Sequence, residues 1–266
     1  MKVMIMGFGN MGKTYANGFI SSRFIKPEDI YVLARNQNSF DGGLGISKSN
    51  FYNEPTSIID ELDIIILSVK PQDFAALAQI IQPFLNKNQL VLSVMAGVTI
   101  DRIQNELQIQ KVIRSMPNIP TQIGMGMTVF TSSPQVDRKE LFIVQNLINT
   151  TGKSVYVEKE QLLNAATAIS GSGPAYVFYF MNAMIQAAVE LGFNESEAEL
   201  LVNQTFMGSV AIQNSHSLSN EDWIKKVASK GGTTESALHV FQKTQLKEAI
   251  VKAIHSANIR AIELGA

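Results

Sequence analysis

Apolar residues in the first 158 positions occur mainly in short, uninterrupted runs, as in strands that are buried on both faces. Between these runs, apolar residues at helical spacing predict helices at 13–20, 74–81 and 136–148, and Thr99 is a candidate cap for one more. Strands that alternate with helices indicate an α/β fold with a doubly wound parallel sheet. The predicted strands lie at residues 3–6, 30–34, 63–69, 89–94, 111–115, 127–130 and 153–157.

The strand pattern ends near residue 160, and the rest of the chain has helical spacing. We therefore predict two domains, a dinucleotide-binding domain at 1–158 and an all-α domain at 159–266. Ala175–Val189 carries no charged residue and is apolar almost all round, so it must be enclosed. A small helical domain has little interior, which predicts that a partner subunit completes the burial. The predicted helices are 161–169, 174–191, 195–213, 220–228, 235–242 and 246–264.

A glycine-rich turn, Gly-Phe-Gly-Asn-Met-Gly, follows the first predicted strand and precedes the first helix. In dinucleotide-binding folds of the Rossmann type, glycines at this spacing permit a tight turn, close approach of the pyrophosphate, and packing of helix on strand. The helix N-terminus then offers free N–H groups to the phosphates. The alternative is a glycine-rich turn that binds nothing. The predicted cofactor contacts here are Gly7, Phe8, Gly9, Asn10, Met11 and Gly12.

The end of the second predicted strand indicates which dinucleotide is bound. Folds that prefer NAD usually carry an acid at this place, but no acid occurs between Ile30 and Phe40. Arg35 is available to pair with a 2′-phosphate, so we predict NADP(H), with NADPH preferred over NADH, and contacts from Ala34, Arg35 and Asn36. The alternative is a solvated surface arginine.

Three more strand ends are candidates for the same site, because ligands of doubly wound sheets lie outside the carboxyl ends of the strands. Each segment alone is an ordinary turn, and only their convergence predicts a crevice. The residues concerned are Val69, Lys70, Pro71, Met95, Ala96, Gly97 and Asn118.

Two small-residue segments, Ser170–Pro174 and Ser229–Thr234, precede predicted helices. Such turns suit a carboxylate or a phosphate, although plain helix capping is the alternative for each. The helical domain also lacks a convincing general acid, which a ketone reductase needs and the reduction of an already protonated imine does not. The three histidines are scattered and no cysteine is present, so no metal site is predicted.

Composition excludes several classes of protein. A net charge of −1 over 266 residues gives no basic field for nucleic acid or an anionic membrane. The absence of cysteine rules out disulfides and thiolate catalysis, and fits a reducing, cytoplasmic location. The N-terminus predicts a strand rather than a signal peptide, and the uncharged segment after Pro174 is too short to span a bilayer comfortably.

Taken in order, these motifs resemble the pyrroline-5-carboxylate reductase family over essentially the whole chain. The segments that carry the resemblance are GFGNMG at 7–12, LSVKPQ at 67–72, RSMPN at 114–118, AISGSGPAYVFYF at 168–180, VASKGGTTESAL at 227–238 and RAIEL at 260–264. The resemblance implies NAD(P)H-dependent reduction of L-Δ1-pyrroline-5-carboxylate to L-proline, the last step of proline synthesis. It also implies homodimers made by interleaved C-terminal helices, often grouped into larger rings.

The resemblance assigns roles to individual residues. Thr234 corresponds to the hydroxyl that hydrogen-bonds the substrate ring nitrogen, and Asn118 lies near the nicotinamide. The substrate carboxylate is expected on Ser229, Gly231, Gly232 and Thr233. The chain departs from the family pattern at Lys230, where proline is usual, at Ser217, where an acid is usual, and around Asn53. A catalytically inactive NADP-binding paralogue with a regulatory role, and a reductase of another cyclic imine or a keto acid, are the alternatives.

Overall fold

A computed structural model describes residues 1–35 and 42–265. These residues form two compact units, Met1–Ser172 with Ala257–Ala266, and Gly173–Ser256. The last helix, α10 (Leu246–Gly265), begins in the second unit and ends in the first. Each unit is described separately below.

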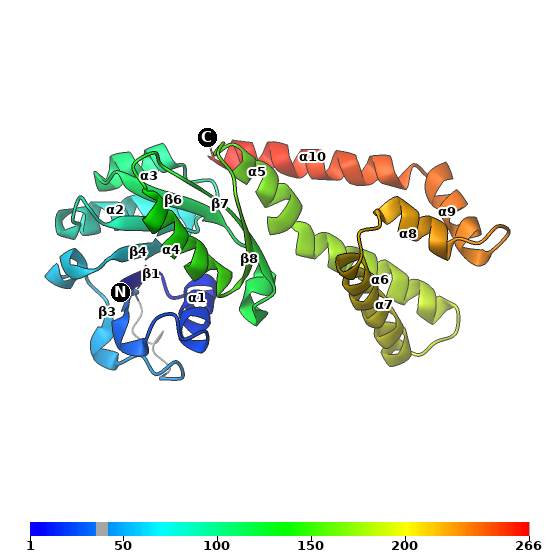
Figure 1. Cartoon of the computed structure of the whole chain (residues 1–266), viewed down its shortest axis with the longest axis horizontal. Helices are drawn as coiled ribbons and strands as arrows, with labels where there is room; N and C mark the ends of the chain where they lie inside the picture. The colour runs from blue at the N-terminus through cyan, green and yellow to red at the C-terminus, as the bar shows by residue number, and fades with distance from the viewer. Residues whose placement is uncertain (36–41, 266) are drawn as a thin grey trace. The chain divides into compact units, whose positions relative to one another are not determined.

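The first unit contains one eight-stranded sheet (Figure 1). Its strands are β1 (Val3–Met6), β2 (Ile30–Leu33), β3 (Phe51–Tyr52), β4 (Ile64–Leu67), β5 (Leu90–Ser93), β6 (Lys111–Met116), β7 (Gly126–Ser132) and β8 (Gly152–Tyr156). Their spatial order is β3-β2-β1-β4-β5-β6-β7-β8, so the chain reverses its direction of winding at β1. Val3 of β1 pairs with Ile30 on one side and Ile64 on the other, both in parallel. The doubly wound sheet is confirmed, and its switch point lies directly before the glycine turn.

One strand corrects the expectation of a purely parallel sheet. β7 runs antiparallel to β6, with Met116 opposite Val129. The connection between them holds only the short 3₁₀ turn Ile119–Ile123. A parallel crossover needs about a dozen residues or more, so a connection this short returns the chain in the opposite direction.

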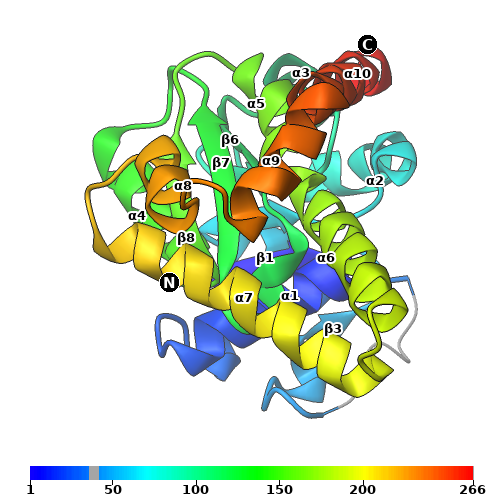
Figure 2. The ribbon, with the colours of Figure 1, turned by 90° about the vertical axis from the view of Figure 1, so that its right-hand side faces the viewer.

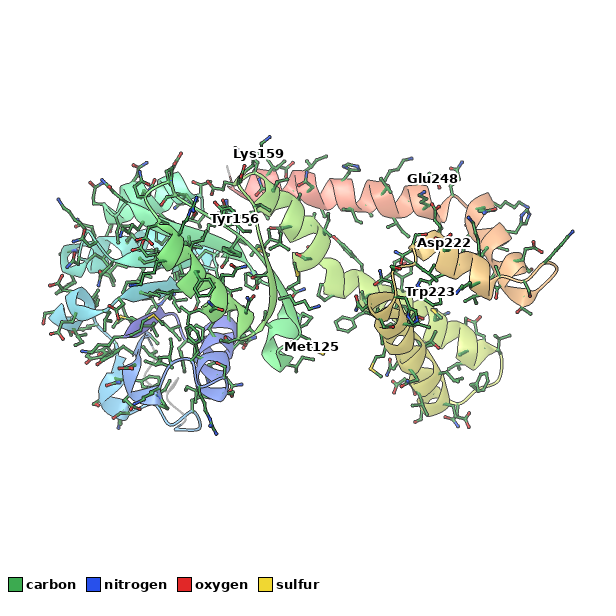
Figure 3. The ribbon with its side chains drawn as sticks, viewed as in Figure 1. Met125, Tyr156, Lys159, Asp222, Trp223 and Glu248 are labelled. Atoms are coloured by element: carbon green, nitrogen blue, oxygen red, sulfur yellow. The ribbon has the colours of Figure 1, made fainter. Side chains whose placement is uncertain are left out.

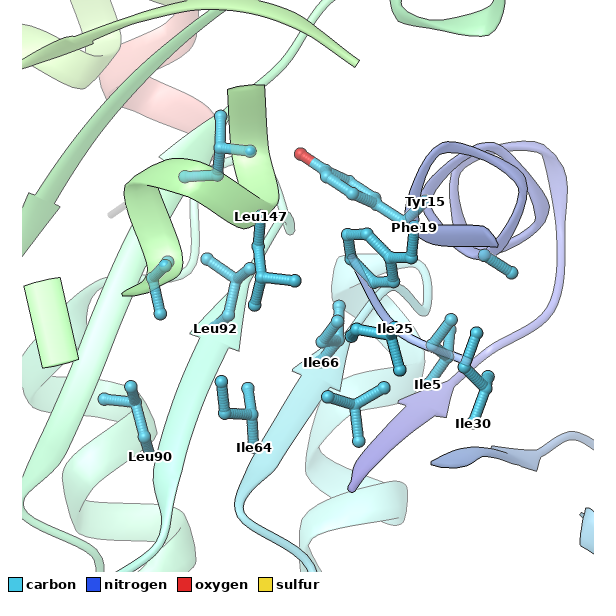
Figure 4. Close-up of a cluster of buried hydrophobic side chains, with 14 of the residues drawn as sticks. Ile5, Tyr15, Phe19, Ile25, Ile30, Ile64, Ile66, Leu90, Leu92 and Leu147 are labelled. Carbon is cyan, nitrogen blue, oxygen red and sulfur yellow. The ribbon is translucent and has the colours of Figure 1, made fainter. Parts of the chain in front are cut away.

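Helices cover both faces of the sheet, which explains the uninterrupted apolar runs. Strand residues such as Ile5 and Ile66 pack with Tyr15 and Phe19 of α1 (Asn10–Ser21) and with α4 (Arg138–Asn149), as Figure 4 shows. On the opposite face, Met4 and its neighbours pack with α2 (Phe74–Ile81) and α3 (Ile100–Leu107). Burial raises the pKa of Tyr15 above its ordinary value, so this phenol stays neutral in the core.

The first unit continues beyond the predicted domain boundary at 158/159. The helix α5 (Leu162–Ala166) packs against β6 and β7, and a π-helical turn, Thr167–Gly171, follows it. Glu160 holds this segment in place, because its Oε1 atom lies 2.7 Å from the Arg114 guanidinium and accepts the Ile100 N–H at 2.9 Å. The main segment of the first unit therefore extends to Ser172, directly before α6 begins at Gly173.

The second unit is all-helical, as predicted. It contains α6 (Gly173–Glu190), α7 (Glu195–Ser215), α8 (Asn220–Val227), α9 (Thr233–Lys243) and the first part of α10. Helices α6 and α7 pack against each other (Figure 2). Trp223 of α8, labelled in Figure 3, packs edge to face against the His216 ring, with 5.5 Å between the ring centroids. Searched over residues 1–35 and 42–265, the chain has no helix with the length and apolar character needed to cross a membrane.

Candidate active site

A cleft of about 520 Å³ lies in the first unit at the carboxyl ends of β1, β2 and β4. It brings together three of the segments that the sequence singled out, the glycine turn, the end of β2 and the end of β4. Six of its lining residues are predicted cofactor contacts: Gly7, Gly9, Ala34, Arg35, Val69 and Lys70. The others are Leu33, Asn53, Ser68, Asp73, Ala76, Leu77 and Ile80.

In the glycine turn, close packing requires glycine at Gly7 and Gly12, whereas Gly9 lies beside open space. Gly7 has a φ of +93°, and a Cβ there would lie 2.8 Å from the Ser68 carbonyl oxygen. A Cβ on Gly12 would collide with the carbonyl oxygen of Gly7. Both glycines are thus required by the fold itself.

Gly9 differs from its neighbours, because a Cβ there would have no heavy atom within 4 Å. Gly9 is the N-cap of α1, and no described side chain caps this helix. The first N–H groups of α1 are therefore available beside open space, which is the arrangement that a phosphate needs. These features fit a dinucleotide pyrophosphate.

Two of the charged residues that line the cleft, Arg35 and Asp73, form an ion pair. Arg35 Nη2 lies 2.5 Å from Asp73 Oδ2, and the Arg35 side chain is 81% exposed. Asp73 ends a 3₁₀ turn, Pro71–Asp73, that follows Lys70. Sequence reasoning missed Asp73, because the acid comes from the β4–α2 connection and not from β2. Asn36, also predicted as a contact, lies outside the described residues.

The other three residues of the glycine turn lie against the core or at the exposed start of α1. Phe8 is buried and contacts the Phe51 ring edge to face at 5.4 Å, so its side chain belongs to the core. Asn10 is the exposed first residue of α1, and Met11 is partly buried against the core.

The β5 end, Met95-Ala96-Gly97, does not line the 520 Å³ cleft. Met95 is buried, and Gly97 has a φ of +77°. A Cβ on Gly97 would lie 2.9 Å from the Leu264 carbonyl oxygen, so the end of α10 packs directly on this loop. The role of these three residues in cofactor binding stays a prediction.

Asn118 connects three parts of the first unit. Its amide donates to the Ser170 carbonyl oxygen at 3.1 Å and accepts the Met127 N–H at 2.8 Å. The end of β6 is thereby joined to β7 and to the π-helical turn, a type of irregularity that is frequent at functional sites. The side chain is a positioning group in this structure, and contact with a nicotinamide stays a prediction.

The predicted substrate turn connects α8 to α9 in the second unit. Gly231 has a φ of +74°, and its N–H donates to Glu235 Oε2 at 2.6 Å. The Gly232 N–H donates to the Ser229 carbonyl oxygen at 3.0 Å, which closes the turn. Two of the N–H groups expected to hold a carboxylate are thus engaged within the chain, whereas those in the first turn of α9 have no described side-chain cap.

Thr234 is the second residue of α9 and is half-buried. Gly232, not a threonine, is the N-cap, and the Thr234 hydroxyl has no hydrogen-bond partner within the described part of the chain. The hydroxyl therefore does not serve as a helix cap. Thr234 lines a pocket of about 410 Å³ together with Trp223 and Leu238.

Known families match both parts of the chain. Residues 160–264 match the family described as pyrroline-5-carboxylate reductase dimerisation. Residues 2–97 match the family described as NADP oxidoreductase coenzyme F420-dependent. The α/β unit is therefore an NADP-binding domain, and it is followed by a dimerisation domain.

Individual proteins match over the full length. Pyrroline-5-carboxylate reductase 2 of Bacillus subtilis is 36% identical, over 99% of this chain and 95% of its own. The crystal structure of Plasmodium falciparum pyrroline carboxylate reductase with NADP bound is 27% identical, covers 100% of this chain and 98% of its own, and has a TM-score of 0.89. A pyrroline-5-carboxylate reductase structure from Coxiella burnetii is 29% identical, with the same coverage and a TM-score of 0.91.

Proposed function

The chain belongs to the pyrroline-5-carboxylate reductase family, and on that basis we propose that it reduces L-Δ1-pyrroline-5-carboxylate to L-proline with NADPH, the last step of proline biosynthesis. The observation that carries the proposal is similarity over 99% of the chain to a reductase of this name. The open space at Gly9 beside the uncapped start of α1 supports binding of a dinucleotide.

The residues of the second unit suit the reduction of a cyclic imine. When bound, the reduced nicotinamide supplies a hydride to the C=N carbon. The turn at Ser229–Thr233 holds the substrate carboxylate through the N–H groups in the first turn of α9, which no described side chain caps, and the Thr234 hydroxyl accepts the N–H of the protonated ring nitrogen. That nitrogen keeps its proton and becomes the amine, so orientation and electrostatics are sufficient and no general acid is needed.

The direct test follows NADPH consumption by the purified chain with Δ1-pyrroline-5-carboxylate, with a 2-keto acid, and with no second substrate. We expect rapid oxidation of NADPH with the cyclic imine alone. Binding of NADPH without oxidation would favour the inactive paralogue, whereas oxidation with the keto acid alone would favour the other reductase class.

We propose further that NADPH is preferred over NADH, because Arg35 lines the cleft at the end of β2. Replacing Arg35→Ala removes a guanidinium that can pair with the 2′-phosphate. Because this side chain is mostly exposed to water, we expect the loss of binding free energy to be only about 1–2 kcal/mol. This loss lowers kcat/KM for NADPH roughly 5- to 30-fold. Kinetics with both cofactors check this, and NADH use should stay within about twofold, because NADH lacks the phosphate. Equal use of both cofactors by the wild type would contradict the preference.

The second unit supports a homodimer formed by the C-terminal helices. α6 has no buried residue in the single chain, and its Val177, Phe178 and Tyr179 are 44%, 60% and 75% exposed. Apolar side chains at this density on one unit are typical of a protein–protein interface. Further association of dimers into a ring belongs to the same proposal.

The dimer is tested by Phe178→Glu, which places a charge on the apolar helix. We expect light scattering to show a dimer or larger assembly for the wild type, and dissociation with loss of activity for this variant, because a buried unpaired charge is costly. Phe142→Glu is the matched control, since Phe142 on α4 is similarly exposed at 67% but lies in the first unit. A stable, active wild-type monomer would defeat the proposal.

A further inference from the structure

The cofactor cleft contains a carboxylate that the sequence around β2 does not supply. Asp73 lies 2.5 Å from Arg35, and both residues line the cleft with Gly7 and Gly9. The end of β2 is the place where dinucleotide folds distinguish a ribose 2′-hydroxyl from a 2′-phosphate, by an acid or by an arginine. This chain has both groups there, Arg35 from the end of β2 and Asp73 from the connection that follows β4, the strand on the other side of β1.

We propose that Asp73 is a second determinant of cofactor selectivity and acts against Arg35. This inference rests on the proposed binding of NADP(H) in the cleft. A 2′-phosphate must compete with Asp73 for the Arg35 guanidinium, and it is also repelled by the carboxylate. A 2′-hydroxyl instead donates a hydrogen bond, which the same carboxylate accepts. Asp73 therefore weakens the binding of NADPH and strengthens the binding of NADH. It thereby reduces the preference for NADPH over NADH that Arg35 creates.

The two partners of the ion pair differ in how firmly they are held. Asp73 is 30% exposed and lies on the 3₁₀ turn that Pro71 begins, where its N–H donates to the Lys70 carbonyl oxygen at 2.9 Å. Arg35 is 81% exposed, so its long side chain can turn from the carboxylate towards a phosphate at little cost. The carboxylate stays in the cleft when the arginine moves. Lys70 also lines the cleft and offers a second cation on the same connection.

A purely structural role for Asp73 predicts the opposite result. If the carboxylate only held Arg35 in the orientation that a phosphate needs, then its neutralisation would weaken NADP⁺ binding. The sign of the change in NADP⁺ affinity thus separates the two interpretations without reference to activity.

The test is calorimetric titration of the full-length protein with NADP⁺ and with NAD⁺, for the wild type and for Asp73→Asn. We expect tighter NADP⁺ binding in the variant, because a charge that repels the 2′-phosphate is removed. The affinity ratio of NADP⁺ to NAD⁺ should rise about tenfold, because the 2′-hydroxyl of NAD⁺ also loses a charged acceptor. Glu106→Gln is the matched control. It neutralises a carboxylate that pairs with Arg102 at 2.7 Å outside the cleft, and should leave the ratio unchanged.

An Asp73→Asn protein with weaker or unchanged NADP⁺ binding would overturn the inference. Arg35→Ala in the same series tests the proposed phosphate contact separately, because it should weaken NADP⁺ binding whether or not Asp73 affects selectivity. Loss of NADP⁺ affinity in Arg35→Ala with no gain in Asp73→Asn defeats the inference alone. A wild-type protein that binds neither nucleotide defeats the cofactor proposal as well.

Discussion

Replacing Thr234→Ala will lower the turnover of Δ1-pyrroline-5-carboxylate by a factor of roughly 30 to 1,000, equivalent to about 2–4 kcal/mol in the barrier. The expected loss is that of one preorganised hydrogen-bonding group at the reacting centre. Binding of NADP⁺ will change little, because the cofactor cleft lies in the other unit. Steady-state kinetics and NADP⁺ titration measure the two effects independently.

The structure also predicts that this variant remains stable. Gly232 is the N-cap of α9, and within the described residues the Thr234 hydroxyl makes no hydrogen bond. Its removal should therefore cost less than the ~1 kcal/mol of a lost helix cap. Thr234→Ser should retain much of the activity, and Ser236→Ala, which removes a hydroxyl farther along the same helix, is the matched control. A Thr234→Ala protein with full turnover would remove this residue from the mechanism.

Replacing Gly9→Ala will weaken NADP⁺ binding by roughly 10- to 100-fold, because the new methyl group enters the space that the pyrophosphate needs, and overpacking costs about 1–3 kcal/mol. The fold should tolerate the change. Gly9 has an extended backbone with φ −80° and ψ −159°, and a Cβ there meets no atom within 4 Å. The melting temperature should fall only slightly, since alanine is a poorer N-cap than glycine.

Gly12→Ala is the matched comparison three residues later. Its Cβ would collide with the Gly7 carbonyl oxygen and lie 2.9 Å from Ser68 Oγ, so this variant should lose stability first and cofactor binding as a consequence. Thermal melts and NADP⁺ titrations on both proteins separate packing from ligand contact. If Gly9→Ala bound NADP⁺ normally, the turn would be a glycine-rich connection without a phosphate site.

Local sequence patterns determined most of the fold. β1 and β4 are uninterrupted apolar runs, and β5 is apolar except for the buried Ser93, because both faces of a doubly wound sheet are covered and no position faces solvent. Helix α2 occupies residues 74–81 as predicted, and the Thr99 side chain caps α3 by accepting the Arg102 N–H at 3.3 Å. These features depend on periodicity and on hydrogen bonds between near neighbours in the chain.

The candidate site could be predicted wherever its residues follow directly from strand ends. Gly7, Gly9, Arg35 and Lys70 line one cleft because the carboxyl ends of parallel strands share an edge of the sheet. Ser68 and Asn53 also line the cleft, but Ser68 falls inside the predicted strand 63–69, and β3 (Phe51–Tyr52) is too short for an apolar pattern to mark its end before Asn53.

The sequence alone predicts the alternation of buried strands and helices, the glycine turn, the absence of an acid near β2, and the small-residue turn before α9. Only the folded chain reveals the antiparallel direction of β7, the packing of α10 on Gly97, and the pairing of Arg35 with Asp73. The physical reason is that periodicity and capping act between near neighbours in sequence, whereas an ion pair across two connections depends on strand order. Strand order arises from the packing of the whole sheet.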